Sequence, residues 1–279
     1  MRSIHHYKMM KYILIFVISL GFACAATGQS YQDKWIQDSL KVETIKAACS
    51  ARQIRNLIDL GTQLQAFGVD DQSISIVRRN LQYGAEHQIW WVDFLQTKSQ
   101  EYFSLILWNG QIIALELYES GLEDINFRHT DREKMLELRQ LKEQDFGTIA
   151  LSDDLLFPLE IKIFGHWCSI GGVPPTYALR MLDLVNEKNK AVLSNWLLSF
   201  DPEIQAYATE GLYYLEQEGI PRSRQELELI EKLNMISNTL IKCEGCFYYV
   251  KRKFREDLDK KSLKRSYKAY KESGWIYRE

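Results

Sequence analysis

The chain has 279 residues, of which 46% are hydrophobic and 26% charged, and its formal net charge is −2. This composition is that of a globular protein and excludes a disordered, collagen-like or coiled-coil chain. The only long apolar run covers residues 13–20, which excludes a protein with several membrane-spanning helices. The sequence contains no nucleotide-binding, zinc-protease, serine-hydrolase or calcium-loop motif.

The N-terminus has the three parts of a secretory signal peptide. A basic start is followed by the apolar run 13–20 and by the small-residue site Ala23–Cys24–Ala25. We therefore expect residues 1–26 to be removed on export, leaving a polar leader over 27–35, with the protein in the periplasm or associated with the outer membrane. Cys24 follows a small residue and is a candidate for lipidation, which would anchor the protein without spanning the membrane.

Residues 36–165 are expected to form an α+β domain, with helices followed by a small antiparallel β-meander. Asn109–Gly110 lies between the apolar runs 102–108 and 111–118, and this pattern predicts a hairpin with a two-residue turn. Such a turn places Ile106 opposite Ile113, and it gives a hairpin with apolar residues on both faces. Either helices cover both faces, which is the favoured alternative, or one face binds a partner. The candidate interaction surface comprises Trp90, Trp91, Ile106, Trp108 and Ile113.

Three other segments of this domain carry local signals. Residues 72–82 fit a strand or a helix equally well. Thr130 and Glu133 have the spacing of a capping box, which predicts a helix over 131–144. Residues 155–164 are expected to form a strand that ends at a glycine.

A Gly- and Pro-containing loop at 166–175 precedes a helical domain over 176–250. Asp201 followed by Pro202 predicts a helix start, and Ser223 with Glu226 predicts another. Because the loop brings His166 close to Cys168, it is also a low-ranking candidate for a reactive site. Side chains two residues apart with no group to orient the base argue against catalysis there.

Two resemblances to known families follow from the order of these elements. Two helices, a Trp-rich strand and the W-N-G-x-I hairpin make residues 40–119 similar to the two-helix, three-strand fold of outer-membrane-assembly lipoproteins and to the β-lactamase-inhibitor-like repeat. That resemblance implies a protein-binding module. Residues 190–236 resemble a HEAT-type helical hairpin, so the helical domain is expected to be HEAT-like or a small helical bundle. The whole chain resembles exported proteins of Gram-negative bacteria.

Four cysteines remain after the expected cleavage, namely Cys49, Cys168, Cys243 and Cys246. An even number in an exported protein permits disulfides. We expect Cys243 and Cys246 to form a local structural disulfide, because the residues on either side look extended and not like the helix start of a redox motif. A redox-active pair and a zinc site that adds His166 and Cys168 remain alternatives, but no metal and no cofactor is expected.

The C-terminal segment 251–279 is basic, with 11 Lys and Arg against 5 Asp and Glu. Such a tail can bind anionic lipid or nucleic acid, but a solvated helix that folds back on the acidic body is the favoured interpretation. An acidic exported body argues against nucleic acid as the partner.

These observations favour an exported, non-enzymatic binding or structural protein of the cell envelope. Its partner is expected to be another envelope protein, with membrane contact limited to a lipid anchor or the basic tail. A thiol redox protein using Cys243 and Cys246 and an envelope hydrolase without a recognisable motif are the alternatives. Enzymatic activity is left open by the sequence, and no catalytic residue is assigned.

Overall fold

The structure is a computed structural model, and it describes most of the chain beyond residue 73. The described residues are 74–94, 99–119, 125–168, 172–236, 239–244 and 247–277, together with short stretches between 43 and 64. The expected signal peptide at 1–26 and the leader at 27–35 therefore lie outside the described residues, as do Cys24, Cys49 and Cys246.

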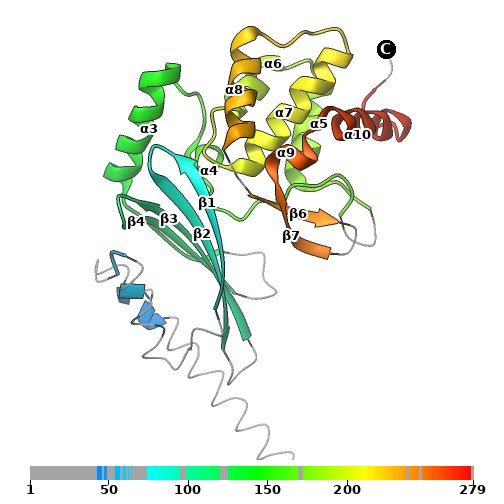
Figure 1. Ribbon diagram of the computed structural model, residues 1–279. Helices are drawn as coiled ribbons and strands as arrows, with labels where there is room; N and C mark the ends of the chain where they lie inside the picture. Colours follow the sequence, from blue (N-terminus) through cyan, green and yellow to red (C-terminus); the bar gives the residue numbers. More distant parts are fainter. Residues whose placement is uncertain are drawn as a thin grey trace, which may run out of the picture.

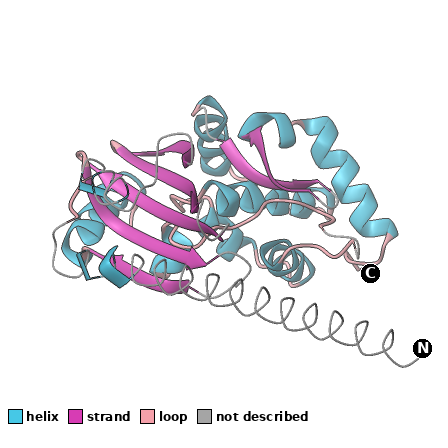
Figure 2. Ribbon diagram, turned by 90° about the horizontal axis from the view of Figure 1, so that it is seen from below, coloured by secondary structure: helices cyan, strands magenta, loops and turns pink. Residues whose placement is uncertain are grey.

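The sheet expected in the first half of the chain is a five-stranded antiparallel meander in the order β1-β2-β3-β4-β5. A separate two-stranded antiparallel sheet, β6-β7, lies later in the chain, and Figure 2 shows the two sheets set apart. The strands are β1 (Ile74–Gln82), β2 (Ala85–Phe94), β3 (Ser99–Trp108), β4 (Gln111–Glu119), β5 (Ile125–Thr130), β6 (Thr239–Glu244) and β7 (Phe247–Lys253).

Helices occupy most of the remaining described chain, and the expected α+β class is confirmed. The five-stranded sheet forms one side of the molecule and helices α5–α8 form the other (Figure 1). The helices are α3 (Arg132–Phe146), α4 (Asp153–Leu156), α5 (Thr176–Asn186), α6 (Lys190–Trp196), α7 (Pro202–Gln217), α8 (Arg224–Met235), α9 (Phe254–Asp257) and α10 (Lys260–Glu272).

The Asn109–Gly110 hairpin is present, with φ values of 52° and 75° at the two turn residues. The pairing continues as expected only as far as Leu107 opposite Ile112, because a bulge then places Ile106 opposite Ala114. Ile113 is the extra residue of the bulge. A bulge exchanges the faces of the residues beyond it, so the expected pairing of Ile106 with Ile113 is wrong.

Both faces of the central strands are covered by other parts of the same chain. One face packs against the N-terminal residues Ile45, Ile54, Leu60 and Leu64, and the other belongs to a cluster that extends into α3 and α5–α8. Internal burial, the favoured alternative, is thus what the structure shows. The candidate interaction surface is corrected accordingly, since Trp90, Ile106 and Ile113 are buried and Trp91 and Trp108 are partly buried against the clusters.

Four further segments of the first domain can be compared with the sequence-based expectations. Residues 74–82 form strand β1, so the segment that fitted a strand or a helix equally well is a strand. Helix α3 begins as expected, but its N-cap is Asp131, whose side chain accepts from Lys134, and not Thr130. The strand expected over 155–164 is absent, because α4 occupies its start and the segment after Pro158 runs irregularly. Strand β5 had no counterpart in the expectations.

The predicted starts of the later helices are confirmed. Asp201 caps α7 by accepting from the backbone N–H groups of Glu203 and Ile204, and Pro202 is the first helical residue. Ser223 and Glu226 form the capping box of α8. Every residue of α7 from Pro202 to Leu215 is buried, so this helix lies at the centre of the helical region and brings its polar side chains into the core.

The basic C-terminal segment folds back on the body as a helix. Leu263 and Tyr270 of α10 and Ile276 after it are buried in the same core cluster as α7. Lys271 donates a hydrogen bond to Glu218 at 2.6 Å, which joins α10 to the residue after α7. The tail is therefore part of the folded protein.

Candidate functional site

Buried polar side chains gather where residues 157–168, here called the connecting segment, run along α7. The ammonium group of Lys162 lies 3.1 Å from the Asp201 carboxylate, and both side chains are fully buried. The hydroxyl group of Tyr207 donates to the carbonyl oxygen of Ile163 at 2.9 Å and accepts from the N–H of Gly165 at 3.0 Å. These contacts give an irregular segment the hydrogen bonds that a strand would otherwise provide.

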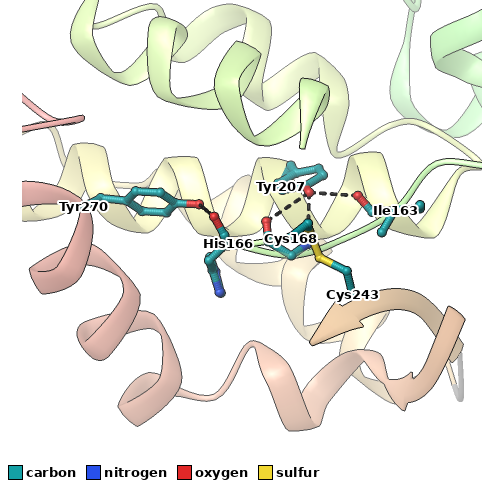
Figure 3. The surroundings of a disulfide bond; sticks show 7 residues. Ile163, His166, Cys168, Tyr207, Cys243 and Tyr270 are labelled. Atoms are coloured by element: carbon teal, nitrogen blue, oxygen red, sulfur yellow. Dashed lines mark hydrogen bonds between the residues drawn. A yellow bond between two sulfur atoms is a disulfide. The ribbon is translucent and has the colours of Figure 1, made fainter. Parts of the chain in front are cut away.

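The connecting segment ends in a disulfide between Cys168 and Cys243, which are separated by 75 residues and have Cα atoms 5.7 Å apart (Figure 3). Strand β6 places Cys243 there, because the Phe164 N–H donates to Ile241 and the Cys243 N–H donates to Phe164. The expected Cys243–Cys246 disulfide is therefore wrong. Proximity in sequence suggested that pair, whereas β6 directs Cys243 toward the connecting segment.

Gly165 is required by the close approach of this disulfide. A Cβ atom at that position would lie within contact distance of both sulfur atoms, 3.1 Å from Sγ of Cys168 and closer still to Sγ of Cys243. Any larger residue would force the sulfur atoms or the backbone to move. Both cysteines are buried, with 6 and 3% of their surface exposed, so a reductant in solvent reaches them only after local opening.

His166 belongs to a hydrogen-bonded network centred on Glu210 of α7. The Nε2 atom of His166 lies 2.6 Å from Oε1 of Glu210, and the hydroxyl groups of Tyr214 and Ser266 donate to the same oxygen. Tyr270 closes the group by donating to the backbone carbonyl of His166 at 3.4 Å (Figure 3). Helices α7 and α10 are thereby joined to the connecting segment through one carboxylate.

Glu210 is fully buried, yet its carboxyl is held in the charged form. Burial alone would raise the pKa of Glu210, but the charge and hydrogen bond of His166 and the hydroxyl groups of Tyr214 and Ser266 lower it below its ordinary value. The network therefore favours a carboxylate at neutral pH. The other carboxylate oxygen, Oε2, is buried and has no partner within the described residues.

A second buried group joins the five-stranded sheet to α7. The guanidinium of Arg79 in β1 donates to both oxygens of Glu203, and it also contacts Nδ1 of His87 in β2 at 2.7 Å. Ser104 in β3 lies 2.8 Å from Nε2 of the same histidine. Burial, together with the nearby charges of Arg79 and Lys162, lowers the pKa of His87 well below its ordinary value, so its ring is neutral.

The reactive loop suggested by His166 and Cys168 is not assembled. Cys168 is bonded to Cys243, and the His166 ring is directed to Glu210, so the two residues do not form a nucleophile and its base. The alternative zinc site fails for the same reason, because two of its four thiol or imidazole ligands are joined to each other. Among the described residues, no group of three or more His, Cys, Asp or Glu side chains is placed to hold a metal ion.

Sequence reasoning missed the two carboxylates on which these groups are centred. Glu203 and Glu210 lie seven residues apart, which places them on one face of α7. Two carboxylates at that spacing in an otherwise apolar helix were an available signal. Their partners, Arg79 and His166, lie far away in sequence. Arg79 had no signal of its own, and His166 stood out only because it lies near Cys168.

The chain matches no family model, no curated protein and no solved structure. The part of the chain that the structure describes includes no helix with both the length and the apolar character that a membrane crossing needs.

Proposed function

We propose that this protein is an exported, non-enzymatic component of the cell envelope, which acts by binding another envelope component. The observation that carries the proposal is the buried disulfide between Cys168 and Cys243. Disulfides form and persist in oxidising compartments outside the cytoplasm. Together with the signal peptide predicted over residues 1–26, this bond supports an exported protein.

The buried polar groups support a binding role over a catalytic one. The carboxylates of Glu203 and Glu210 are each engaged by several donors from other elements, and Cys168 is held in a disulfide. Arg79 and Glu203 are 1 and 0% exposed, so a substrate would have to open the core to reach them. These groups hold the sheet, the connecting segment and the helices together, which is what a rigid binding scaffold needs.

Export and disulfide formation are tested in the same experiment. The full chain is produced in a Gram-negative host, and the intact mass and the thiol content of the fractionated protein are measured before and after reduction. We expect a product that has lost residues 1–26, or a diacylated product that starts at Cys24. We also expect a peptide that joins Cys168 to Cys243 in the unreduced digest.

A matched comparison makes the result specific to export. A variant with Leu14→Arg and Val17→Arg interrupts the apolar run and should keep the protein in the cytoplasm, with Cys168 and Cys243 reduced. Finding an intact N-terminus at Met1 or Met10 in the envelope fraction of the unaltered chain would reject the signal peptide. An oxidised pair in the cytoplasmic variant would remove the disulfide as support for export.

A further inference from the structure

Helix α10 (Lys260–Glu272) has two opposite faces of different character. Its buried face holds Leu263, Ser266 and Tyr270, which pack against the helical core. Its other face holds five exposed basic residues. At about 100° per residue, these five fall within roughly 140° of arc, centred opposite the buried residues. They are Lys260, Lys261, Lys264, Arg265 and Lys268.

The basic surface continues beyond the helix. Lys253 and Arg255, just before α10, are also exposed. The exposed acids of the same stretch are fewer, namely Glu256, Asp259 and Glu272, and Lys268 lies 3.6 Å from Glu272. The face therefore keeps a clear excess of positive charge on a protein whose formal net charge is −2.

Two exposed aromatic side chains follow this helix. Trp275 is 37% exposed and Tyr277 is 69% exposed, although the backbone around them is fixed by hydrogen bonds to Asn186. Trp and Tyr with one side in water are typical of the boundary between a membrane and water, where the ring enters the headgroup region. Two exposed aromatic residues that directly follow the basic helix in the chain fit a surface that is both anionic and partly apolar.

We propose that the exposed face of α9 and α10, with Trp275 and Tyr277, binds the surface of a membrane rich in anionic phospholipid. The proposal rests on the proposed function in one respect, because an envelope protein meets such a surface in its own compartment. The lysines and arginines attract the lipid phosphates, and the aromatic rings enter the headgroup layer. The buried side of α10 stays in the protein core, so the helix lies on the membrane and does not insert.

A membrane is favoured over nucleic acid by the distribution of charge. A flat membrane surface can contact the basic face without approaching the rest of the protein. A long nucleic acid would also lie close to the remainder of the chain, in which acidic residues exceed basic ones, and would be repelled there. Exposed Trp275 and Tyr277 add an apolar contribution that a phosphate backbone does not use. Nucleic-acid binding is therefore the competing outcome of the test.

The test measures binding of the processed full chain to lipid vesicles by sedimentation. All proteins carry Cys24→Ser, so that a lipid attached to Cys24 does not contribute. Vesicles of phosphatidylglycerol and phosphatidylcholine in a 3:7 ratio are compared with pure phosphatidylcholine. We expect binding to the anionic vesicles at low salt, loss of that binding in 0.5 M NaCl, and weak binding to the neutral vesicles.

Two matched variants assign the binding to α10. Replacing Lys261, Lys264 and Lys268 with Gln removes three charges from the basic face and should weaken partitioning to the anionic vesicles about a hundredfold. Replacing Arg78, Arg132 and Arg224 with Gln removes three exposed charges elsewhere and should leave partitioning within about threefold of the parent. Equal unfolding temperatures of the two variants show that both are folded.

Three results would overturn the proposal. The first is equal binding of the two triple variants to anionic vesicles, and the second is equal binding of the parent to both kinds of vesicle. The third is tighter binding to double-stranded DNA than to anionic vesicles at the same salt, which would assign the face to nucleic acid. The first result compares two proteins with the same N-terminus, so it does not depend on whether residues 1–26 are cleaved, and failure there is distinct from failure of the proposed export.

Discussion

Arg79 in β1 and Glu203 in α7 form a buried ion pair in which Nη1 of the arginine donates to both carboxylate oxygens, at 2.6 and 2.7 Å. Glu203 also accepts from the backbone N–H of Ile241 in β6 at 2.7 Å. One carboxylate thus joins the five-stranded sheet, the central helix and the second sheet. Burial raises the pKa of Glu203 above its ordinary range, and the charge of Arg79 opposes that rise.

Removing one partner of the Arg79–Glu203 pair should destabilise the folded protein much more than removing both partners. Glu203→Leu leaves the Arg79 charge buried and uncompensated, and we expect it to lower the free energy of unfolding by about 3–5 kcal/mol. The double variant Arg79→Met, Glu203→Leu leaves no charge behind and should recover more than half of that loss. Urea unfolding measures both values.

The exposed ion pair of Arg224 and Glu228 is the control for the Arg79 and Glu203 variants. Its side chains are 92 and 55% exposed, and Glu228→Leu should change the free energy of unfolding by less than about 0.5 kcal/mol. A double variant of Arg79 and Glu203 as unstable as the sum of its two single variants would show that the pair is not coupled in the folded protein.

The lowered pKa of Glu210 predicts a pH-dependent contribution to stability. A carboxyl whose pKa is lower in the folded than in the unfolded chain stabilises the fold above the unfolded value, about 4.3, and this contribution is lost as pH falls through the folded value. Glu210→Gln removes the contribution. The difference in unfolding free energy between parent and variant should be largest above pH 5 and should shrink below pH 4.

Urea unfolding between pH 3 and 7 tests this expectation, with Glu228→Gln as an exposed control that should follow the parent closely. A difference between parent and Glu210→Gln that stays constant over the whole range would contradict the stabilisation of the charged form by His166, Tyr214 and Ser266.

The position of the disulfide predicts a large effect of its removal. A bridge across 75 residues restricts the unfolded chain by about 4 kcal/mol in the loop-closure description. Cys168→Ser with Cys243→Ser should therefore lower the melting temperature by roughly 10 °C. Cys246→Ser is the control and should leave the melting temperature and the Cys168–Cys243 peptide unchanged. A large effect of Cys246→Ser would restore the local pair expected from the sequence.

The parts of the fold that were predictable from sequence are those whose contacts close within a few residues. Asp201 satisfies the first N–H groups of α7, Ser223 and Glu226 satisfy those of α8, and Asn109–Gly110 adopts the positive φ values of a tight turn. Each of these signals is complete in the local sequence, so distant contacts do not alter it.

The parts that sequence did not predict depend on contacts between distant residues. Cys243 pairs with Cys168 because β6 lies beside Phe164, and no residue near Cys243 encodes that neighbour. The bulge at Ile113 changes which apolar residues share a face, although the turn next to it is as expected. The irregular connecting segment is stabilised by Tyr207 of α7 and by Asp201, the N-cap residue of that helix, which a strand prediction over 155–164 could not include.

In the candidate site, too, the sequence identified individual residues but not their partners in space. His166 and Cys168 were recognised as unusual residues, but their partners in space are Glu210 and Cys243 and not each other. The spacing of Glu203 and Glu210 on α7 was visible in the sequence. What it meant became clear only once the structure placed Arg79 and His166 against them.

Gly165 allows a direct test of the packing around the disulfide. Gly165→Ala places a methyl group against both sulfur atoms and should lower the free energy of unfolding by about 1–3 kcal/mol. In the background Cys168→Ser, Cys243→Ser the same substitution should have a smaller effect, because two smaller, unlinked side chains can move apart. Thermal unfolding of the four proteins measures this coupling, and equal effects in both backgrounds would place the clash elsewhere.

Lys142 in α3 is a buried cation whose removal should stabilise the protein. Its ammonium group donates to the carbonyl oxygen of Ser199 at 2.9 Å and lies 4.2 Å from the Phe200 ring centre, and burial lowers its pKa to about 7. Lys142→Met keeps the volume and leaves the Ser199 carbonyl bonded to the side chain of Gln205. We expect Lys142→Met to raise the free energy of unfolding by about 1–3 kcal/mol at pH 6.

The sign of the pH dependence identifies the cause of this gain. Between pH 7 and the unfolded value near 10.4, the unfolded chain binds the lysine proton more tightly than the folded chain does. The contribution of Lys142 to stability therefore rises with pH in that window, and the advantage of Lys142→Met should decrease between pH 7 and 10. Exposed Lys261→Met should show no such trend in urea unfolding. An advantage of Lys142→Met that does not change with pH would mean that packing, and not the buried charge, is responsible.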